Sequence, residues 1–570
     1  MNVLLFDAAQ QSGCAIAVAP DAAKPERFAA EELQRYLSAA TGGEFPILDA
    51  SASDEPGFLV GAVGRSLVEP LPELSEDGYV MRRVGDQIAL LGGSPRATLY
   101  AAYHFLERYI GCRWLEPGDD AIPTLSRIAV GDIDDVEEPV YTFRSVLSFP
   151  FTAERCVKEA DWLAKNRLNW THPGINHPHT WEECRGAETV MPEVVKRGLH
   201  TLWGGHTFQT WIPTDVYFET HPEFFGLIDG KRIPQVNDKG SLCLSNPQLQ
   251  QEVAGNILRF AAENPDIDVL DIWMNDTVDW CECENCERMD GDPSYIEHAE
   301  TFSVEGKPQK SRAYYAFVNN VARMVGAENP TLRLGPLAYA RTFEPPHELK
   351  VEPNVIVGFT NFTRSTINSL LDDSGANAGS KLNMIYVETI RRWQGHADPE
   401  NLFIYEYYDY PLTFNPFSEY RTNVQQMAEE LKWYPKVGIR QMSTEGAGED
   451  YWRPMVMYVY GRLVWNPEQS YEAIMEDFCR HAYGDVADQM LEFWKIQELR
   501  QPHITQRDKN LETLRRIKQM TGDKQVQARL DHLQELVLRS DRITKWPSEE
   551  QPKEEAPGGL VGWGDEKAEE

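Results

Sequence analysis

The residues best suited to chemistry lie in one stretch, residues 268–286. An apolar run of strand character, 269–274, ends on an amide and a carboxylate, Asn275 and Asp276. An α/β barrel directs chemistry out of the carboxyl end of such strands. We therefore expect Asp276 to act as a general acid and Asn275 to be its polarising partner. Because consecutive strand residues point to opposite faces, both can take part only if the strand has ended or bulged there.

Three cysteines follow this strand end closely, at Cys281, Cys283 and Cys286. Their density is typical of a thiolate metal site, in which zinc would take a fourth ligand such as Cys184, Cys243 or a histidine. Three ligands are an incomplete signature, so reduced free thiols and a disulfide stay open beside a structural zinc. No feature indicates a catalytic metal, and we expect catalysis to require no cofactor.

Two further acids end predicted strands elsewhere, Glu406 in an aromatic run and Glu445 before Gly-Ala-Gly. Cleavage of a glycosidic bond needs a protonated acid at the leaving oxygen and a second group that stabilises positive charge at the anomeric carbon. Carboxylates from separate strands, with amides and aromatic rings around them, suit this reaction. We expect Glu406 and Glu445 to be supporting or alternative acids beside Asp276.

Side chains at or after the strand ends are candidates for substrate contact. Aromatic rings would provide apolar platforms for sugar faces, and polar groups would provide hydrogen bonds. The candidates are Trp203, His206, Tyr339, Arg341, Asn361, Tyr407, Tyr408 and, in the loop after the second strand, His177. Each of them could instead be an ordinary core residue or the partner of a neighbouring charge.

The elements that would position these residues alternate between short apolar strands and helical patterns, which predicts a parallel sheet. The candidate strands are 142–148, 167–170, 198–203, 269–274, 332–339, 355–360, 402–407 and 439–444. The helical patterns between them are 159–165, 192–197, 249–263, 313–325, 389–396 and 423–433. The sequence therefore predicts an α/β fold, a (β/α)₈ TIM-like barrel with long loops. A doubly wound open sheet is the runner-up, but no glycine-rich nucleotide loop follows any strand.

The barrel is expected to span 138–450, between a small amino-terminal α/β accessory domain at 1–137 and a helical carboxy-terminal domain at 451–545. The accessory domain should contain strands and helices at 15–18, from Pro25, at 57–61, 78–82 and 87–93, and at 97–110 after the cap Ser94-Pro95. Spacings of three and four between apolar residues predict the later helices. These are 453–465, 471–483, 485–500, 510–520 and 524–544, and residues 546–570 have the composition of a disordered acidic tail.

The bulk composition limits the classes of molecule that the chain is expected to bind. The chain of 570 residues carries a net charge of −34, which would repel phosphate groups and argues against nucleic acid and anionic membranes. No run approaches the roughly 18 apolar residues that a membrane span needs. The start lacks the features of a signal peptide, and the odd number of cysteines, nine, favours a cytoplasmic location. A secreted chain with its signal removed would look the same, and homo-oligomerisation stays open.

Several longer motifs are specific enough to indicate a family. Residues 215–232, 242–247, 336–339 and 461–467, together with Asn275-Asp276 and the cysteines, resemble a bacterial family known as domain of unknown function 4838. That family is similar to glycoside hydrolase family 163 and more distantly to the family 67 α-glucuronidases. In the amino-terminal region, residues 28–37 and 93–103 resemble the accessory domain of α-glucuronidases and β-hexosaminidases.

The resemblance implies a glycoside hydrolase that acts on an oligosaccharide. Similarity to family 163 implies an endo-β-N-acetylglucosaminidase with substrate-assisted retention, in which the substrate acetamido oxygen is the nucleophile. Similarity to family 67 implies instead an α-glucuronidase-like exo-hydrolysis, with Glu406 and Glu445 as the acids and Arg341 or Arg364 binding the uronate carboxylate. A non-catalytic carbohydrate-binding barrel is a third reading.

Overall fold

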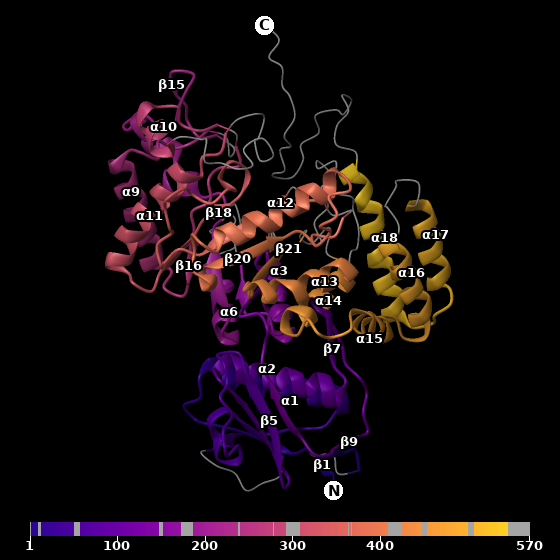
Figure 1. Ribbon diagram of the computed structural model, residues 1–570. Coiled ribbons are helices and arrows are strands. Elements are labelled where there is room, and N and C mark those ends of the chain that lie inside the picture. Colours follow the sequence, from indigo (N-terminus) through magenta and orange to yellow (C-terminus); the bar gives the residue numbers. More distant parts are fainter. Residues whose placement is uncertain are drawn as a thin grey trace.

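The chain forms three parts (Figure 1). The amino-terminal part lies at one end, the barrel lies in the middle, and the last helices pack against one side of the barrel. The computed structural model describes residues 2–9, 13–50, 57–147, 152–172, 186–236, 240–277, 279–291, 308–362, 364–365, 368–408, 424–446, 453–499 and 507–544. Within these ranges, every helix is too short or too polar to cross a membrane.

The amino-terminal part is built on a six-stranded sheet of order β10-β5-β6-β4-β2-β3, against which two helices pack side by side. The helices are α1 (Lys24–Thr41) and α2 (Pro95–Phe105), and the strands are β2 (Ala15–Val18), β3 (Ile47–Asp49), β4 (Gly57–Val60), β5 (Tyr79–Val84), β6 (Gln87–Gly92) and β10 (Asp134–Glu137). Ser94 caps α2 as expected, because its Oγ accepts a hydrogen bond from the Ala97 N–H at 3.2 Å. The helix continues as a π-helical turn, η2 (Leu106–Ile110), which completes the expected segment 97–110.

Two small antiparallel pairs complete this part, β1 with β9 and β7 with β8. Their bounds are β1 (Val3–Asp7), β9 (Arg127–Val130), β7 (Arg113–Glu116) and β8 (Asp119–Ala121), and a 3₁₀ helix, η1 (Gly61–Leu67), follows β4. Strand β1 has no counterpart among the expected strands. Its partner β9 lies far along the chain, so this pairing leaves no local signal in the sequence.

The barrel strands are all parallel and occur in the order β17-β16-β13-β12-β11-β21-β20-β19-β18. Their bounds are β11 (Phe143–Leu147), β12 (Trp170–Thr171), β13 (His200–Trp203), β16 (Val269–Asp271), β17 (Arg333–Gly335), β18 (Leu337–Ala338), β19 (Val357–Thr360), β20 (Leu402–Glu406) and β21 (Gln441–Glu445). Each lies within or next to one of the expected strands. The prediction of a TIM-like barrel is therefore confirmed.

The barrel closes at Pro336, which divides one strand into β17 and β18. Proline has no N–H to donate to a strand ladder, so the pairing is interrupted there. The chain still bridges to β19, because the Gly358 N–H donates to the Pro336 carbonyl at 3.0 Å and the Ile356 N–H donates to the Leu334 carbonyl at 2.9 Å. Counting β17 and β18 as one, the nine strands of the sheet form an eight-stranded barrel.

Helices and short turns connect the barrel strands. They are α3 (Ala153–Lys165), α5 (Gly186–Thr189), α6 (Met191–Arg197), α7 (Phe208–Trp211), α8 (Thr214–Tyr217), η3 (Pro222–Phe224), α9 (Pro247–Glu263), α10 (Glu284–Asp290), α11 (Ser311–Glu328), η5 (Ala340–Thr342), α12 (Ala378–Trp393), η6 (Pro399–Asn401), α13 (Val424–Trp433) and η7 (Tyr434–Val437), with the hairpin β14 (Leu227–Ile228) and β15 (Lys231–Arg232). Helix α12 begins well before the expected 389, because Asn377 caps it by accepting a hydrogen bond from the Ser380 N–H at 2.9 Å.

Helix α14 (Pro454–Trp465) packs directly on the barrel wall. Its Tyr460 hydroxyl donates to the Ser145 carbonyl at 2.9 Å and to the Met442 carbonyl at 3.3 Å, so the helix bridges β11 and β21. We therefore count α14 as a barrel helix, and the boundary expected at residue 451 moves to the segment after it. The later helices are α15 (Tyr471–Tyr483), η8 (Gly484–Val486), α16 (Ala487–Leu499), α17 (Arg507–Lys518) and α18 (Lys524–Thr544). The expected tail, 546–570, lies outside the described residues.

Alternation along the barrel strands separates two hydrophobic clusters. The inner cluster fills the barrel and takes alternate residues from its strands: Phe143, Leu147, Trp170, Leu202, Val269, Trp273, Leu337, Ile356, Phe403 and Tyr405. The residues between them, such as Leu270 and Ile404, belong to the larger cluster that packs against the surrounding helices. This parity decides which polar residue of a strand end can reach the barrel mouth.

Hydrogen bonds to Asp77 connect the amino-terminal part to the amino ends of the barrel strands. It accepts hydrogen bonds from Arg96 of α2 at 2.8 Å, from Arg144 of β11 at 2.7 Å and from the Asn169 amide at 2.7 Å. All four side chains are buried. Burial would raise the pKa of Asp77, but Arg144 and Arg96 outweigh it and hold the pKa below its usual value. The contact leaves the carboxyl ends of the strands open for chemistry.

Replacement of Asp77 by alanine leaves two buried guanidinium groups without their shared carboxylate. We expect it to lower the free energy of unfolding by about 3–5 kcal/mol, measured by urea denaturation. Asp134→Ala is the control, because Asp134 pairs with Arg82 at 2.8 Å while 68% exposed, and its loss should cost less than about 1 kcal/mol. Equal effects of the two substitutions would contradict this role of Asp77.

Candidate active site

A closed circuit of aromatic rings surrounds the carboxyl ends of the barrel strands. Each ring contacts the next at centroid distances between 5.1 and 6.4 Å. In order around the circuit the members are Trp273, Tyr405, Tyr407, Phe362, Tyr339 and His206. Tyr339, Tyr407 and His206 are thus brought together as expected, whereas Trp273, Tyr405 and Phe362 were not among the predicted contacts.

Two carboxyl groups are attached to this circuit by tyrosine hydroxyls. Tyr339 donates to Asp276 Oδ1 at 3.2 Å, and Tyr405 donates to Glu445 Oε2 at 2.7 Å. Asp276 is half-buried, while Glu445 is only 6% exposed. The charge of Asp276 acts on Glu445. The structure therefore brings together two of the predicted acids, each oriented by a ring of the mouth.

The environment of Glu445 favours its protonated form. Burial raises its pKa, the hydrogen bond from Tyr405 lowers it, and the negative charge of Asp276 raises it, with a resulting value of about 8. A carboxyl group that stays neutral at pH 7 can donate a proton to a substrate oxygen. Asp276 has more contact with solvent and accepts a hydrogen bond from the Tyr339 hydroxyl. The two carboxyls are thus placed in different environments.

A buried histidine–aspartate pair lies below the rings. His172 Nε2 is 2.6 Å from Asp271 Oδ2, and the His172 ring stacks on Trp273 at 5.7 Å. Burial raises the pKa of Asp271, although the charge of His172 and its hydrogen bond oppose the shift. Gly335 makes room for this carboxyl, because a Cβ there would lie 2.5 Å from Asp271 Oδ1. The parity of β16, which turns Val269 and Trp273 inward, was the signal that could have found Asp271.

Glu406 points away from the mouth, which corrects the expectation that it is a catalytic acid. It is 1% exposed and accepts hydrogen bonds from the Asn361 amide at 2.5 Å, the Tyr434 hydroxyl at 3.0 Å and Arg364 Nε at 3.1 Å. Its neighbours Tyr405 and Tyr407 face inward, so parity turns Glu406 toward the helix layer. Its role there is to hold the barrel wall to that layer.

The same buried network corrects the expected substrate contacts Asn361 and Tyr408. Asn361 donates to Glu406, and Tyr408 donates to Glu430 Oε2 of α13 at 2.9 Å. Arg364 also bonds Glu430, at 2.9 Å, so its guanidinium is held between two buried carboxylates. A side chain engaged in this way is not placed to bind a substrate carboxylate.

Trp203 and Arg341 also lie outside the aromatic circuit, which corrects both expectations. The Trp203 ring packs against Phe260 of α9 at 4.2 Å, on the outward face of β13. Arg341 Nε donates to the Pro308 carbonyl at 2.8 Å, and its guanidinium lies 6.0 Å from the centre of the Trp280 ring. Burial lowers the pKa of Arg341 to about 10. Both residues therefore contact the surrounding helices and loops and not the aromatic circuit.

The side chain of Asn275 forms hydrogen bonds to a loop and not to the carboxyl group of Asp276. Its amide donates to Gln235 Oε1 at 2.6 Å and to the Gly240 carbonyl at 3.0 Å. A small hollow lies beside it, and its lining includes Gly240, Leu242, Met274 and Trp280. The strand has ended at Asp271, so the two neighbours turn to different surroundings. The expected division of labour between Asn275 and Asp276 is thereby replaced by a positioning contact.

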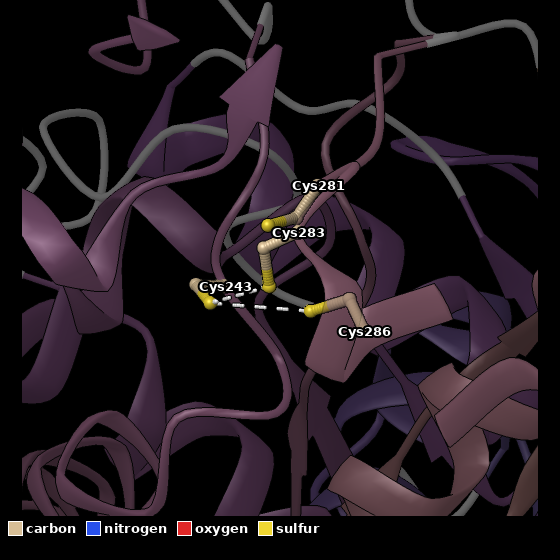
Figure 2. A group of neighbouring side chains, drawn as sticks. All are labelled: Cys243, Cys281, Cys283 and Cys286. Carbon is tan, nitrogen blue, oxygen red and sulfur yellow. Dashed lines mark hydrogen bonds between the residues drawn. The ribbon is translucent and has the colours of Figure 1, made fainter. Parts of the chain in front are cut away.

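Cys281, Cys283 and Cys286 do come together, and Cys243 joins them (Figure 2). The four sulfur atoms lie within 4.8 Å of one another. Among the described residues, these cysteines form a group that could hold a metal ion. The cluster stands beside the loop that Asn275 holds. Two other predicted candidates, His177 and Cys184, lie outside the described residues.

Comparisons with known proteins agree with this architecture. A family described as domain of unknown function (DUF4838) matches residues 114–495, and the glycosyl hydrolase family 67 N-terminus matches residues 7–105. Both resemblances indicated by the motifs are thus confirmed. No curated protein matches the sequence significantly.

One solved structure shares the fold over nearly the whole chain. It is BtGH115A, a family GH115 4-O-methyl-α-glucuronidase with specificity for decorated arabinogalactans. The TM-score is 0.58 at 11% identity, and the match covers 95% of this chain and 73% of that chain. This neighbour shows that the fold of the whole chain occurs in a solved structure, and the family 67 match agrees with the resemblance expected for the amino-terminal part.

Replacement of Glu445 by glutamine should change how stability depends on pH. The pKa of Glu445 rises from 4.5 to about 8 on folding, so the stability that its protonated form contributes is complete below pH 4.5 and is lost as the pH rises through about 8. Between about pH 5 and pH 9 we expect the free energy of unfolding of Glu445→Gln to rise by on the order of 2–4 kcal/mol relative to that of the wild type, measured by urea denaturation. Parallel pH profiles would refute the raised pKa.

Replacement of Glu406 by alanine should act on stability first. It leaves Arg364 and two polar groups buried without their acceptor, so we expect a loss of about 3–5 kcal/mol in the free energy of unfolding. Glu429→Ala on the exposed face of α13 is the control and should cost less than about 1 kcal/mol. A variant at 406 that is as stable as the wild type would argue against the structural assignment.

Proposed function

We propose that this chain, which belongs to the family described as domain of unknown function (DUF4838), hydrolyses a glycosidic bond in an oligosaccharide. Its residues 7–105 match the N-terminus of glycosyl hydrolase family 67. The observation that carries the proposal is the pair Glu445 and Asp276, two carboxyls that interact electrostatically and are each bonded to a tyrosine of the aromatic circuit. Such a pair in unequal environments is the arrangement that glycosidases use.

Glu445 is the general acid in this proposal. Its raised pKa of about 8 keeps the proton on the carboxyl at neutral pH, and the proton passes to the glycosidic oxygen as the bond to the anomeric carbon breaks. This reverses the sequence-based assignment, in which Asp276 was the acid. Asp276 instead carries the negative charge that stabilises the positive charge developing at the anomeric carbon.

The aromatic circuit provides the substrate surface. Tyr339 and Tyr407 are half-buried, so one part of each ring reaches the mouth. Flat apolar rings with polar tips are suited to the alternating apolar and hydroxyl surfaces of a sugar. Both tyrosines that orient the carboxyls belong to this circuit, which couples substrate binding to the positions of the acids.

An α-linked uronide is the substrate class that we favour. The GH115 neighbour is named as a 4-O-methyl-α-glucuronidase, and the amino-terminal match is to glycosyl hydrolase family 67, the family that the sequence motifs link to α-glucuronidases. The β-N-acetylglucosaminide reading relied on Asn275 beside Asp276, and the Asn275 amide is engaged with Gln235 and Gly240. Arg364 is bound by two buried carboxylates, so it is not placed to bind the carboxylate of a uronide.

A panel of aryl glycosides tests the substrate. We expect the highest kcat/KM for an α-glucuronide, a much lower value for the α-glucoside that differs only in lacking the carboxylate, and a low value for β-N-acetylglucosaminide. Highest turnover of the β-N-acetylglucosaminide would replace the proposed substrate by the other reading. Turnover of none of them, with binding of oligosaccharide, would favour a carbohydrate-binding barrel.

The roles of the two acids can be separated by the leaving group. Glu445→Gln should lower kcat about 10²–10⁴-fold with a sugar leaving group, and much less with a nitrophenyl group that departs without protonation. Asp276→Asn should lower kcat similarly with both leaving groups, because it acts at the anomeric carbon. Glu429→Gln, an exposed residue of α13, is the control and should keep full activity. Leaving-group dependence in Asp276→Asn, and not in Glu445→Gln, would restore the original assignment.

A further inference from the structure

Four cysteines from two loops meet beside the barrel mouth. Cys243 lies in the loop before α9, while Cys281, Cys283 and Cys286 lie in the loop after β16 and the first turns of α10. Figure 2 shows their sulfur atoms turned toward a common centre. Cys243 Sγ is 3.6 Å from Cys283 Sγ and 3.9 Å from Cys286 Sγ.

These distances match a tetrahedral metal site. With zinc–sulfur bonds of about 2.3 Å, the sulfurs at the corners of a tetrahedron are about 3.8 Å apart. Sulfurs in a disulfide are about 2.05 Å apart, and all four cysteines are free thiols. The spacing is therefore too long for a disulfide and suits four thiolates around one ion.

The surroundings can balance the charge of thiolates. The Leu227 N–H donates to Cys281 Sγ at 3.3 Å, and Arg232 Nη1 lies 3.8 Å from the same sulfur. Arg232 is itself held by the Phe225 carbonyl at 2.6 Å. N–H groups and a cation around the sulfurs orient the ligands and stabilise their deprotonated form.

The cysteines make up a small apolar cluster. Cys243, Cys281 and Cys286 form a buried cluster of their own, with Leu227 and Cys283 packed against it. The main barrel clusters contain none of these cysteines. A group this small buries little apolar surface, so a metal ion would add a link between the two loops that apolar packing does not provide.

We propose that Cys243, Cys281, Cys283 and Cys286 bind one structural zinc ion. The ion joins residues 243–246 to residues 281–286, and both loops border the strand end that carries Asp276. The first loop is continuous with Gly240, whose carbonyl holds Asn275. The second is paired to the β14 strand, because the Glu282 N–H donates to the Leu227 carbonyl at 2.7 Å. Zinc thus acts as a positioning element for the candidate active site and takes no part in the chemistry.

The metal content of the full-length protein tests the site directly. Purified without chelator and measured by mass spectrometry, the wild type should contain about one zinc per chain. Cys243→Ala should lose the metal, whereas Cys479→Ala, which removes another buried cysteine outside the cluster, should keep it. Zinc well below one per chain in the wild type, or full zinc in Cys243→Ala, overturns the proposal. One iron per chain in place of zinc would keep the ligands and overturn the identity of the ion.

Cobalt replacement tests the ligand set in the wild type, so the result does not depend on whether a variant folds. Co²⁺ in the site should show the intense visible bands of tetrahedral cobalt together with thiolate-to-metal charge transfer. Weak octahedral bands would overturn a tetrathiolate site. Removal of zinc by a chelator should increase hydrogen exchange in residues 240–246 and 276–290 and leave α1 and α2 unchanged. These readouts do not require activity, so they stand or fall separately from the proposed reaction.

Discussion

Closure of the parallel barrel is the constraint on which the rest of the structure depends. All strands run the same way, so their carboxyl ends meet at one rim, and residues distant in sequence become neighbours there. Closure survives at Pro336, where the ladder is interrupted, because the Pro336 carbonyl still accepts from Gly358. Were the sheet open, Asp276 after β16 and Glu445 on β21 would not face the same space. The electrostatic interaction between these two carboxyls is a consequence of the closed ring.

Strand parity then divides the polar residues into two groups with different roles. Residues that turn inward, such as Asp271 and Glu445, occupy a narrow space among aromatic rings, where burial raises the pKa of both. Residues that turn outward, such as Glu406, are neutralised by Arg364 between the barrel wall and the helices. An uncompensated charge in either place would be costly, but only the inner group can meet a substrate. The surroundings of a carboxyl group, and the partners it can have, therefore change with one step along a strand.

The two ends of the barrel are secured by different interactions. At the amino end, Asp77 joins Arg96 and Arg144 in a buried group of charges, and the amino-terminal part covers that end (Figure 1). At the carboxyl end, four cysteines from two loops lie close together (Figure 2), and the proposed zinc ion would join these loops. Long loops with few apolar contacts are necessary around a binding site, and they need local links to stay ordered.

The sequence by itself determined the barrel strands, most helices and the family, because these follow from local periodicity, capping and motifs. It also singled out Asp276, Glu445 and three of the cysteines from their positions after apolar runs, and it named Cys243 as one of several possible fourth ligands. Only the tertiary structure decided which of those residues work together. Cys243 joins the cluster from a loop 40 positions away, and Glu406 and Trp203 turn outward although they end strands as Glu445 does. The physical reason is that facing direction and long-range proximity depend on register and closure, which no local pattern contains.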